Sequence, residues 1–340
     1  MVTLISAVIG ALVGAGFASG RELVTFFVSF GPQGMLGVLL MTSLFAGGCL
    51  LLIWLCEHLA LDSYEALLAE IFPPFWAKIF TILVSLGLWL GLGMMLSGCG
   101  TLGAVLLGWP SWLGFILALG GTYWPLVRGG ESFLRLNGWL IPIMVIFAAI
   151  MALTFLARPL SCAAALPPVQ LVPNWPIAAV LYWLYNSLLS MAVLVGIRRK
   201  RHVRLAVLAG SFLIGVLALL LCACLTLLPP ALQETQMPML TLAQVMGGFW
   251  KICYGVVMIL AMYTTALANC YGLVVNYEYR ITHRKTLLLF ILLPTVAFGP
   301  FDFGRLVSTI YPLLGYASAP IMAGMLYKAA KLLSRSGGRL

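Results

Sequence analysis

Three glycines and a serine interrupt the first apolar segment of the chain about halfway along it. This segment runs from Val2 to about Phe27, and residues 14–22 within it read GAGFASGRE. Each glycine costs about 1 kcal/mol relative to alanine inside a helix. Backbone groups freed from helical hydrogen bonds are tolerated at membrane depth only where protein or a wet cavity satisfies them. A break at this depth is typical of a secondary transporter, which binds its ligand there.

The composition places the chain among helical membrane proteins. Hydrophobic residues make up 63% of it and charged residues 8%, against roughly 25% charged in an ordinary soluble domain. Its mean hydropathy is +1.09, and several apolar runs exceed the ~20 residues that cross a bilayer. The N-terminus has no basic region and no small-residue cleavage site, so residues 2–27 are expected to be a retained span. We expect an all-α polytopic protein with one transmembrane domain over residues 1–340.

Apolar runs along the chain predict about ten transmembrane helices, with boundaries uncertain by a few residues. They lie near residues 2–27, 34–59, 78–107, 111–127, 136–157, 174–197, 203–228, 248–276, 286–300 and 305–331.

The basic residues fix the expected orientation. If the N-terminus is cytoplasmic, 15 of the 19 Lys and Arg residues fall in cytoplasmic connectors or the C-terminal segment, and the exceptions are Arg21, Arg158, Lys251 and Arg305. This is the positive-inside distribution, so both termini are expected in the cytoplasm. The cluster between Arg198 and Arg204 serves as a topology anchor in this interpretation, although an anionic-lipid site is an alternative.

Ten spans with both termini on one side allow two halves of five spans, near residues 1–157 and 174–331, with opposite topology. Many transporters have this inverted repeat, and the first helix of each half is then broken. The corresponding sixth span reads WLYNSLLS at residues 183–190, so we expect a second break around Asn186. The alternative is a continuous helix whose Asn186 hydrogen-bonds to a neighbour.

The GAGFASGRE motif, followed by Phe26-Phe27 and Phe30-Gly31, resembles the opening of the bacterial YkvI-like membrane proteins. That family is grouped with the amino acid–polyamine–organocation superfamily. The resemblance therefore implies the LeuT fold, with its 5+5 inverted repeat, and a place in the bacterial cytoplasmic (inner) membrane.

The same resemblance implies a sodium site. In sodium-coupled LeuT-fold carriers, one sodium site takes a carbonyl and two hydroxyls at i, i+3 and i+4 of the eighth helix, and two carbonyls of the first. By position these groups belong to Gly10, Val13, Ala261, Thr264 and Thr265. Neutral oxygens can bind Na⁺ without burying a carboxylate at the midplane. The alternative is that both threonines bond back to the preceding turn. No other cofactor is expected.

Substrate is expected between the two breaks, where freed backbone amides face the cavity. The predicted binding residues are Gly16, Phe17, Ala18, Ser19, Gly20 and Glu22 from the first span, and Asn186, Ser187 and Ser190 from the sixth. Glu22 is the one carboxylate expected at membrane depth, and such an acid is functional by default. It could bind a substrate amine, carry a coupling proton, or pair with Arg21 or another base.

These features favour an ion-coupled carrier, driven by Na⁺ or H⁺, of a small organic solute such as an amino acid or amine. A ligand-sensing receptor on the same scaffold is the alternative. An enzyme is disfavoured because His58, His202 and His283 lie at cytoplasmic ends without a paired acid at depth. The placement of the charges excludes nucleic acid as a partner, leaving the solute and the bilayer. The cysteines lie almost entirely in apolar runs, as buried hydrophobic residues do. The sequence does not indicate an oligomeric state.

Overall fold

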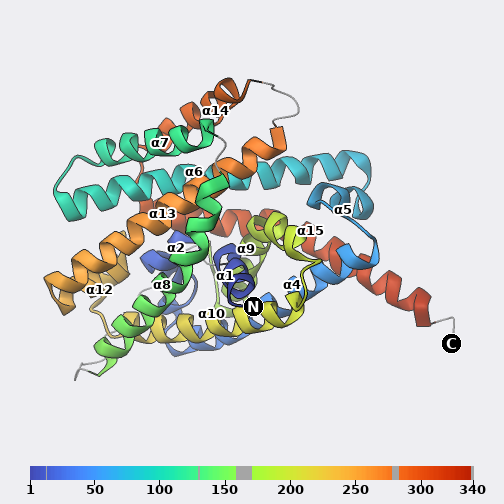
Figure 1. The fold of residues 1–340 in the computed structure, drawn as a ribbon. Coiled ribbons are helices and arrows are strands. Elements are labelled where there is room, and N and C mark those ends of the chain that lie inside the picture. Colours follow the sequence, from blue (N-terminus) through green and yellow to red (C-terminus); the bar gives the residue numbers. More distant parts are fainter. Residues whose placement is uncertain (13, 129–130, 158–170, 278–282, 338–340) are drawn as a thin grey trace.

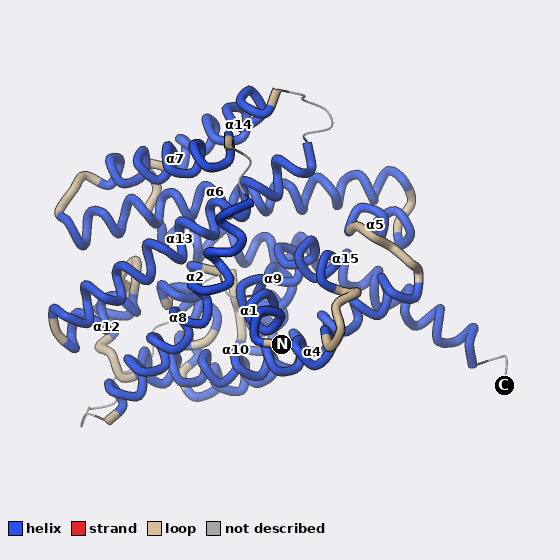
Figure 2. The backbone as a smooth tube through the Cα atoms, viewed as in Figure 1, coloured by secondary structure: helices blue, strands red, loops and turns tan. Residues whose placement is uncertain are grey.

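The computed structural model describes residues 1–12, 14–128, 131–157, 171–277 and 283–337. Figures 1 and 2 show that helices joined by short loops make up this described part of the chain, without strands. The helices beyond the first span are α4 (Pro32–His58), α5 (Tyr64–Ile71), α6 (Pro74–Leu107), α7 (Ser111–Val127), α8 (Glu131–Leu156), α9 (Trp175–Ile197), α10 (Val203–Thr226), α11 (Pro230–Gln233), α12 (Pro238–Met246), α13 (Gly248–Tyr277), α14 (Arg284–Leu292) and α15 (Phe303–Gly337).

The first span is broken twice. It consists of α1 (Val2–Leu12), α2 (Ala15–Ser19) and α3 (Arg21–Phe26), and a short 3₁₀ turn, η1 (Val28–Phe30), follows. Gly14 is extended, with φ −83° and ψ 176°, and Gly20 is left-handed, with φ +79°. A side chain at Gly20 would also lie 2.6 Å from Cγ of Met239, so only glycine fits both the conformation and the packing. The predicted break in the first span is confirmed.

Six of the described helices are long and apolar enough to cross a membrane, judged by length and composition: α4, α6, α9, α10, α13 and α15. Shorter apolar helices cover Ser111–Val127 and Leu140–Leu156. Two further predicted spans escape this criterion for physical reasons. The first is broken at its glycines, and the ninth changes at Pro294 from α14 into the 3₁₀ helix η2 (Leu293–Phe298). The chain is therefore a helical polytopic membrane protein.

The sixth predicted span is not broken, and this part of the expectation was wrong. Helix α9 continues from Trp175 to Ile197 without interruption. Residues 183–190 contain neither glycine nor proline, so nothing in them prevents helical dihedrals. Nδ2 of Asn186 donates to the carbonyl of Tyr182 at 3.0 Å, and the hydroxyl of Ser190 to the carbonyl of Ser187 at 3.3 Å. The side chains of Asn186 and Ser190 thus bond within the helix and do not require a break.

The contacts of helices in the earlier part of the chain have counterparts in the later part: those of α1 correspond to those of α9, and those of α6 to those of α13. Helix α1 packs against α9, α10 and α8, while α9 packs against α1, α4 and α15. Helix α6 packs against α7 and α15, and α13 packs against α14 and α8. Helix α6 also packs against α13, and α4 packs against α10. These contacts join the part of the chain before residue 157 to the part after residue 174 (Figure 1).

The outer surface of the bundle is apolar. Large hydrophobic side chains are exposed on several helices, among them Leu39, Ile82, Ile146 and Phe212, and each is at least half exposed. A soluble monomer rarely exposes apolar surface of this extent. Since lipid tails cover such a surface at no hydration cost, this pattern fits a chain embedded in a bilayer.

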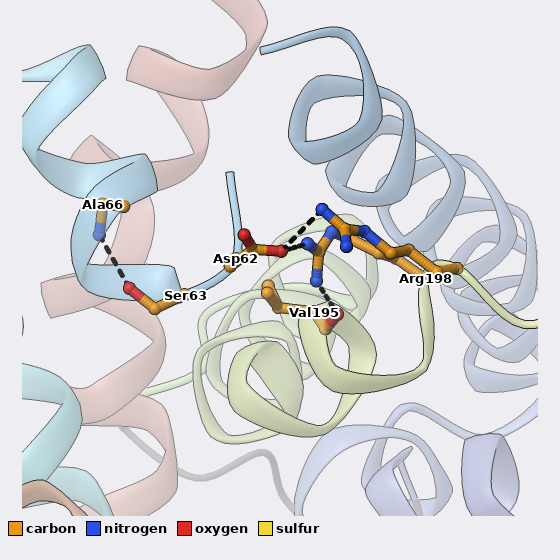
Figure 3. Close-up of polar contacts among 6 residues, drawn as sticks. Asp62, Ser63, Ala66, Val195 and Arg198 are labelled. Carbon is orange, nitrogen blue, oxygen red and sulfur yellow. Dashed lines mark hydrogen bonds and ion pairs between the residues drawn. The ribbon is translucent and has the colours of Figure 1, made fainter. Parts of the chain in front are cut away.

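Polar contacts between connectors gather at two ends of the bundle. At one end the Arg198 guanidinium, itself buried, donates to the carboxylate of Asp62 and to the carbonyl of Val195, as Figure 3 shows. Ion pairs Arg204–Glu57 and Lys328–Glu70, at 2.6 and 2.7 Å, also join connectors predicted to be cytoplasmic.

At the other end, Arg21 donates to the carbonyls of Glu234 and Thr235 at 3.2 and 3.5 Å, and Nε2 of Gln236 donates to Asp302 at 3.1 Å. These residues all lie in or beside connectors predicted to be external. These contacts thus connect residues that are predicted to lie on the same side of the membrane.

Candidate substrate cavity

A cavity of about 340 Å³ lies at the break in the first span. Residues of α1, α3, α6, α9, α13 and α15 form its walls, so both halves of the chain contribute to it. Much of the lining is small or aliphatic. The polar lining consists of Glu22, Tyr185, Asn186, Thr265, Asn269, Tyr271, Asn276 and Tyr311. Its volume lies in the range of ordinary small-molecule sites.

Glu22 is the acid of this cavity, and its side chain is held from α9. The residue is 2% exposed, and Oε2 accepts hydrogen bonds from the phenols of Tyr182 at 2.9 Å and Tyr185 at 2.7 Å. The ring of Tyr185 stacks on that of Tyr311, with centroids 4.5 Å apart and planes 6° apart. Two tyrosines of α9 therefore hold one carboxyl group at the cavity wall, and Tyr311 of α15 packs against one of them.

Gly16 lies directly against this carboxyl group. A Cβ atom on Gly16 would be 1.9 Å from Oε1 of Glu22. The glycine therefore leaves the space that Oε1 occupies, and this oxygen lies against the backbone of α2. The structure thus brings two predicted binding residues, Gly16 and Glu22, together.

Arg21 does not neutralise Glu22. Its guanidinium points to the carbonyls of Glu234 and Thr235, away from the cavity. None of the ion pairs among the described residues involves Glu22. The expected alternative of a pair with the neighbouring arginine is therefore not what the structure shows, because Arg21 and Glu22 are successive residues of α3 and their side chains leave the helix in different directions.

The other predicted residues of the first span pack away from the cavity. Phe17 and Ala18 are buried, and the carbonyl of Ala18 accepts from the phenol of Tyr254 at 2.6 Å. The hydroxyl of Ser19 donates to the carbonyl of Gly16 at 2.6 Å and accepts from the amide of Arg21 at 3.1 Å. Ser19 thus stabilises the turn at Gly20 and does not line the cavity.

Of the predicted residues on α9, only Asn186 lines this cavity. Ser187 faces a separate small apolar cavity of about 20 Å³ beside Cys49 and Met322, and its hydroxyl is buried without a hydrogen-bond partner. Ser190 is fully buried against the helix backbone.

A small cavity of about 50 Å³ lies between α1, α8 and α13. Its lining includes four of the residues predicted for the sodium site: Gly10, Ala261, Thr264 and Thr265. Thr264 donates to the carbonyls of Leu260 and Ala261 at 2.9 and 3.2 Å, and Thr265 donates to Ala261 at 2.8 Å. The hydroxyl protons are thus directed to the helix, as in the alternative interpretation, while the oxygen lone pairs remain. Val13 lies outside the described residues.

Sequence reasoning did not assign Tyr182, Tyr185 or Tyr311, nor a stripe along α13. That stripe places Thr265, Asn269, Gly272 and Asn276 on one face at i, i+4, i+7 and i+11, and all four line the cavity. The spacing was visible in the sequence, and a polar stripe on an apolar helix signals a wet or protein-facing wall. The role of the tyrosines emerges only when α3 and α9 are brought together.

One end of the cavity adjoins a second cavity of about 450 Å³, which we call the vestibule. The two share the lining residues Ala192, Val275 and Asn276. That cavity reaches the connector after α4, where Asp62 is exposed. At the junction, Nδ2 of Asn276 donates to the phenol of Tyr64 at 2.6 Å. Burial raises the pKa of the Tyr64 phenol, so it is neutral at physiological pH.

At the opposite end, α12 packs over α2 and α3. Contacts there join Gly20 to Met239 and Arg21 to the carbonyls before α12. The cavity therefore has one end that leads toward a vestibule and one that is covered.

Two curated relatives cover nearly the whole chain. It is 28% identical over 331 residues to YkvI, an uncharacterized membrane protein of Bacillus subtilis (strain 168), covering 95% of this chain and 94% of the relative. It is 25% identical over 325 residues to the uncharacterized protein YyaD of the same organism, covering 94% of each. No protein-family model matches the chain.

Solved structures share its fold. The nucleobase-cation-symport-1 family transporter Mhp1 matches with a TM-score of 0.62 in a closed, bromovinylhydantoin-bound form and 0.64 in an inward-facing form, at 16% and 15% identity. These matches cover 95% of this chain and 76% and 74% of Mhp1. A manganese transporter of Eremococcus coleocola matches with a TM-score of 0.59 at 14% identity, covering 95% of this chain and 77% of that one. At these identities the likeness is one of fold, and the fold is that of membrane transporters.

Proposed function

We propose that this chain is a secondary active transporter that moves a small organic solute, such as an amino acid or amine, by alternating access. The observation that carries the proposal is the 340 Å³ cavity at the broken first span, with the buried Glu22 in its wall. Its two ends differ, since one adjoins a vestibule and the other is covered by α12. A carrier caught open to one side has this asymmetry.

The proposal includes a 5+5 inverted repeat and membership of the amino acid–polyamine–organocation superfamily. The matched helix contacts support the repeat: the packing of α1 on α8 corresponds to that of α9 on α15, and α1 on α10 corresponds to α9 on α4. A pseudo-two-fold axis relating the halves produces such pairs. In this repeat only the first helix is broken, and α9 is its continuous counterpart.

Transport is coupled to Na⁺ or H⁺ in this proposal. The cavity lined by Gly10, Ala261, Thr264 and Thr265 offers neutral oxygens to Na⁺, and Glu22 offers a site for a proton. Mhp1 is described as a nucleobase-cation-symport-1 family transporter, and symport with a cation is the kind of transport proposed here. The substrate of Mhp1 is not part of the proposal. Manganese is not carried over either, because the described residues contain no group of three or more His, Cys, Asp or Glu side chains that could hold a metal ion.

Uptake by proteoliposomes tests the function directly. Purified protein is reconstituted, and labelled amino acids and amines are offered under an inward Na⁺ gradient, an inward H⁺ gradient, or neither. We expect one solute class to accumulate above protein-free liposomes, and one gradient to drive it. Saturable binding of a solute without accumulation under any gradient would contradict transport and favour the receptor alternative.

A further inference from the structure

We infer that the cavity takes a small organic cation, with Glu22 as its counter-charge, and discriminates against zwitterions and anions. This inference rests on the proposed function only in taking the cavity as the substrate site. Three observations on its walls support it: the charge, the direction of the hydrogen bonds and the aromatic faces.

The ionisable group of the wall is an acid. Of the residues that line the cavity in the described part of the chain, Glu22 alone has a carboxylate or a basic side chain. Arg21 is engaged elsewhere, with the carbonyls of Glu234 and Thr235. An amino acid would bring a second carboxylate beside Glu22 without a cationic side chain to receive it, and unpaired charge is costly away from water. An ammonium or guanidinium group instead neutralises the acid that is already buried.

The hydrogen bonds of the wall leave acceptors for a ligand. The phenol of Tyr185 donates to Glu22, and the hydroxyl of Thr265 donates to the carbonyl of Ala261. Asn186 and Asn276 direct their amide nitrogens to Tyr182 and Tyr64.

Each asparagine thus directs one of its two amide N–H groups to the protein, and the acceptor oxygens that remain are both Oδ1 atoms and the carboxyl group of Glu22. A complementary ligand is rich in donors, as an ammonium with three N–H groups or a guanidinium with five is.

The aromatic wall fits the same ligand through Tyr311. Tyr185 and Tyr311 both line the cavity, and their rings cover each other at 4.5 Å; Tyr185 also stacks on Phe26, so the outer face of Tyr311 is the one that a ligand can use. Cations bind favourably over tyrosine faces, most strongly where water is excluded. A carboxylate gains nothing from these faces.

Matched probes separate the classes. Binding to the purified full-length protein in nanodiscs is measured by calorimetry and thermal shift. One set contains 2-phenylethylamine, L-phenylalanine and 2-phenylethanol, and a second contains 3-methylbutylamine, L-leucine and 3-methylbutanol. Butylguanidine adds the other donor-rich cation. Within each set the hydrocarbon part is constant: the amino acid adds a carboxylate to the amine, and the alcohol replaces its ammonium by a neutral hydroxyl.

We expect at least one cation to bind at least tenfold more tightly than its amino acid and alcohol partners. Glu22→Gln, which keeps an oxygen for Tyr182 and Tyr185, should weaken that cation at least tenfold. The matched control is Glu70→Gln, which removes an acid that pairs with Lys328 on the surface and should leave affinity unchanged.

The inference is overturned if an amino acid binds as tightly as its amine, if Glu22→Gln retains the affinity for the cation, or if none of the cations binds. Proteoliposomes keep this test apart from the proposed function. A bound cation that is never accumulated would support the inference and contradict transport. Accumulation of a zwitterion or anion with no affinity for cations would do the reverse.

Discussion

At the scale of single residues, the site depends on one contact between a glycine and a carboxyl group. Gly16 leaves the space in which Oε1 of Glu22 lies, while the phenols of Tyr182 and Tyr185 hold Oε2. Buried polar groups are normally hydrogen-bonded, and here Oε2 accepts from two phenols. The position of the Glu22 carboxyl group therefore depends on Gly16 having no side chain.

Gly16→Ala tests this contact. The added methyl group would lie 1.9 Å from Oε1, so Glu22 must leave its tyrosine partners. We expect a loss of stability of about 1–3 kcal/mol, as for other overpacked sites, and at least a tenfold loss of solute affinity. Thermal unfolding and calorimetry measure both.

Gly47→Ala on α4 is the control, since a Cβ there meets nothing within 4 Å. It should be neutral or stabilising by up to about 1 kcal/mol, through helix propensity alone. Wild-type stability and affinity in Gly16→Ala would show that Glu22 does not need this space.

At the scale of elements, α13 serves two cavities with one face. Thr265 lines both the small cavity beside Gly10 and the large cavity, and Asn269 and Asn276 continue the large one toward the vestibule. An ion bound at the threonines would therefore touch the wall of the substrate cavity. This adjacency provides a physical route for coupling, because both ligands would stabilise the same arrangement of α1 and α13.

Thr264→Val together with Thr265→Val tests the sodium site. Valine keeps the shape of threonine and removes the two oxygens. If Na⁺ is the coupling ion, we expect the stimulation of uptake by Na⁺ to fall at least tenfold while the protein still folds.

Thr122→Val on α7 is the matched control, because Thr122 is buried and makes the same bond to its own helix, at 2.8 Å to Ala118, but lines neither cavity. It should leave Na⁺ stimulation intact. Unchanged stimulation in the double variant would remove the assignment of the site to these threonines.

At the scale of the whole molecule, the bundle has two chemically distinct ends. Arg198, Arg204 and Lys328 pair with acids at one end, and Arg21 with carbonyls at the other. Since the basic residues concentrate at the first end, we predict that it faces the cytoplasm. The vestibule beside Asp62 then makes this an inward-open arrangement.

Labelling of engineered cysteines at the two ends tests this orientation. In a variant lacking Cys162 and Cys253, Ala231→Cys on α11 and Ser334→Cys on α15 place exposed thiols at opposite ends. A membrane-impermeant maleimide added to intact cells should label position 231 and leave position 334 unlabelled until the cells are opened. The reverse pattern would invert the predicted topology, and labelling of both before lysis would contradict the three predicted spans that separate the two positions.

The sequence alone determined the class of the protein and the interruption of its first span. Length of apolar runs, charge placement and the glycines of residues 14–20 act locally, through hydration and backbone conformation, so they are readable without the fold. They located most of the helices and predicted that Glu22 lies at membrane depth.

The tertiary structure decided which residues meet. Asn186 does not break α9, because its amide finds a carbonyl in its own helix. Phe17, Ser19, Ser187 and Ser190 were expected in the cavity, yet they pack elsewhere. Tyr182 and Tyr185 became partners of Glu22 because α3 and α9, about 160 residues apart in sequence, pack side by side. Such contacts depend on helix rotation and packing across the bundle, which no local pattern encodes.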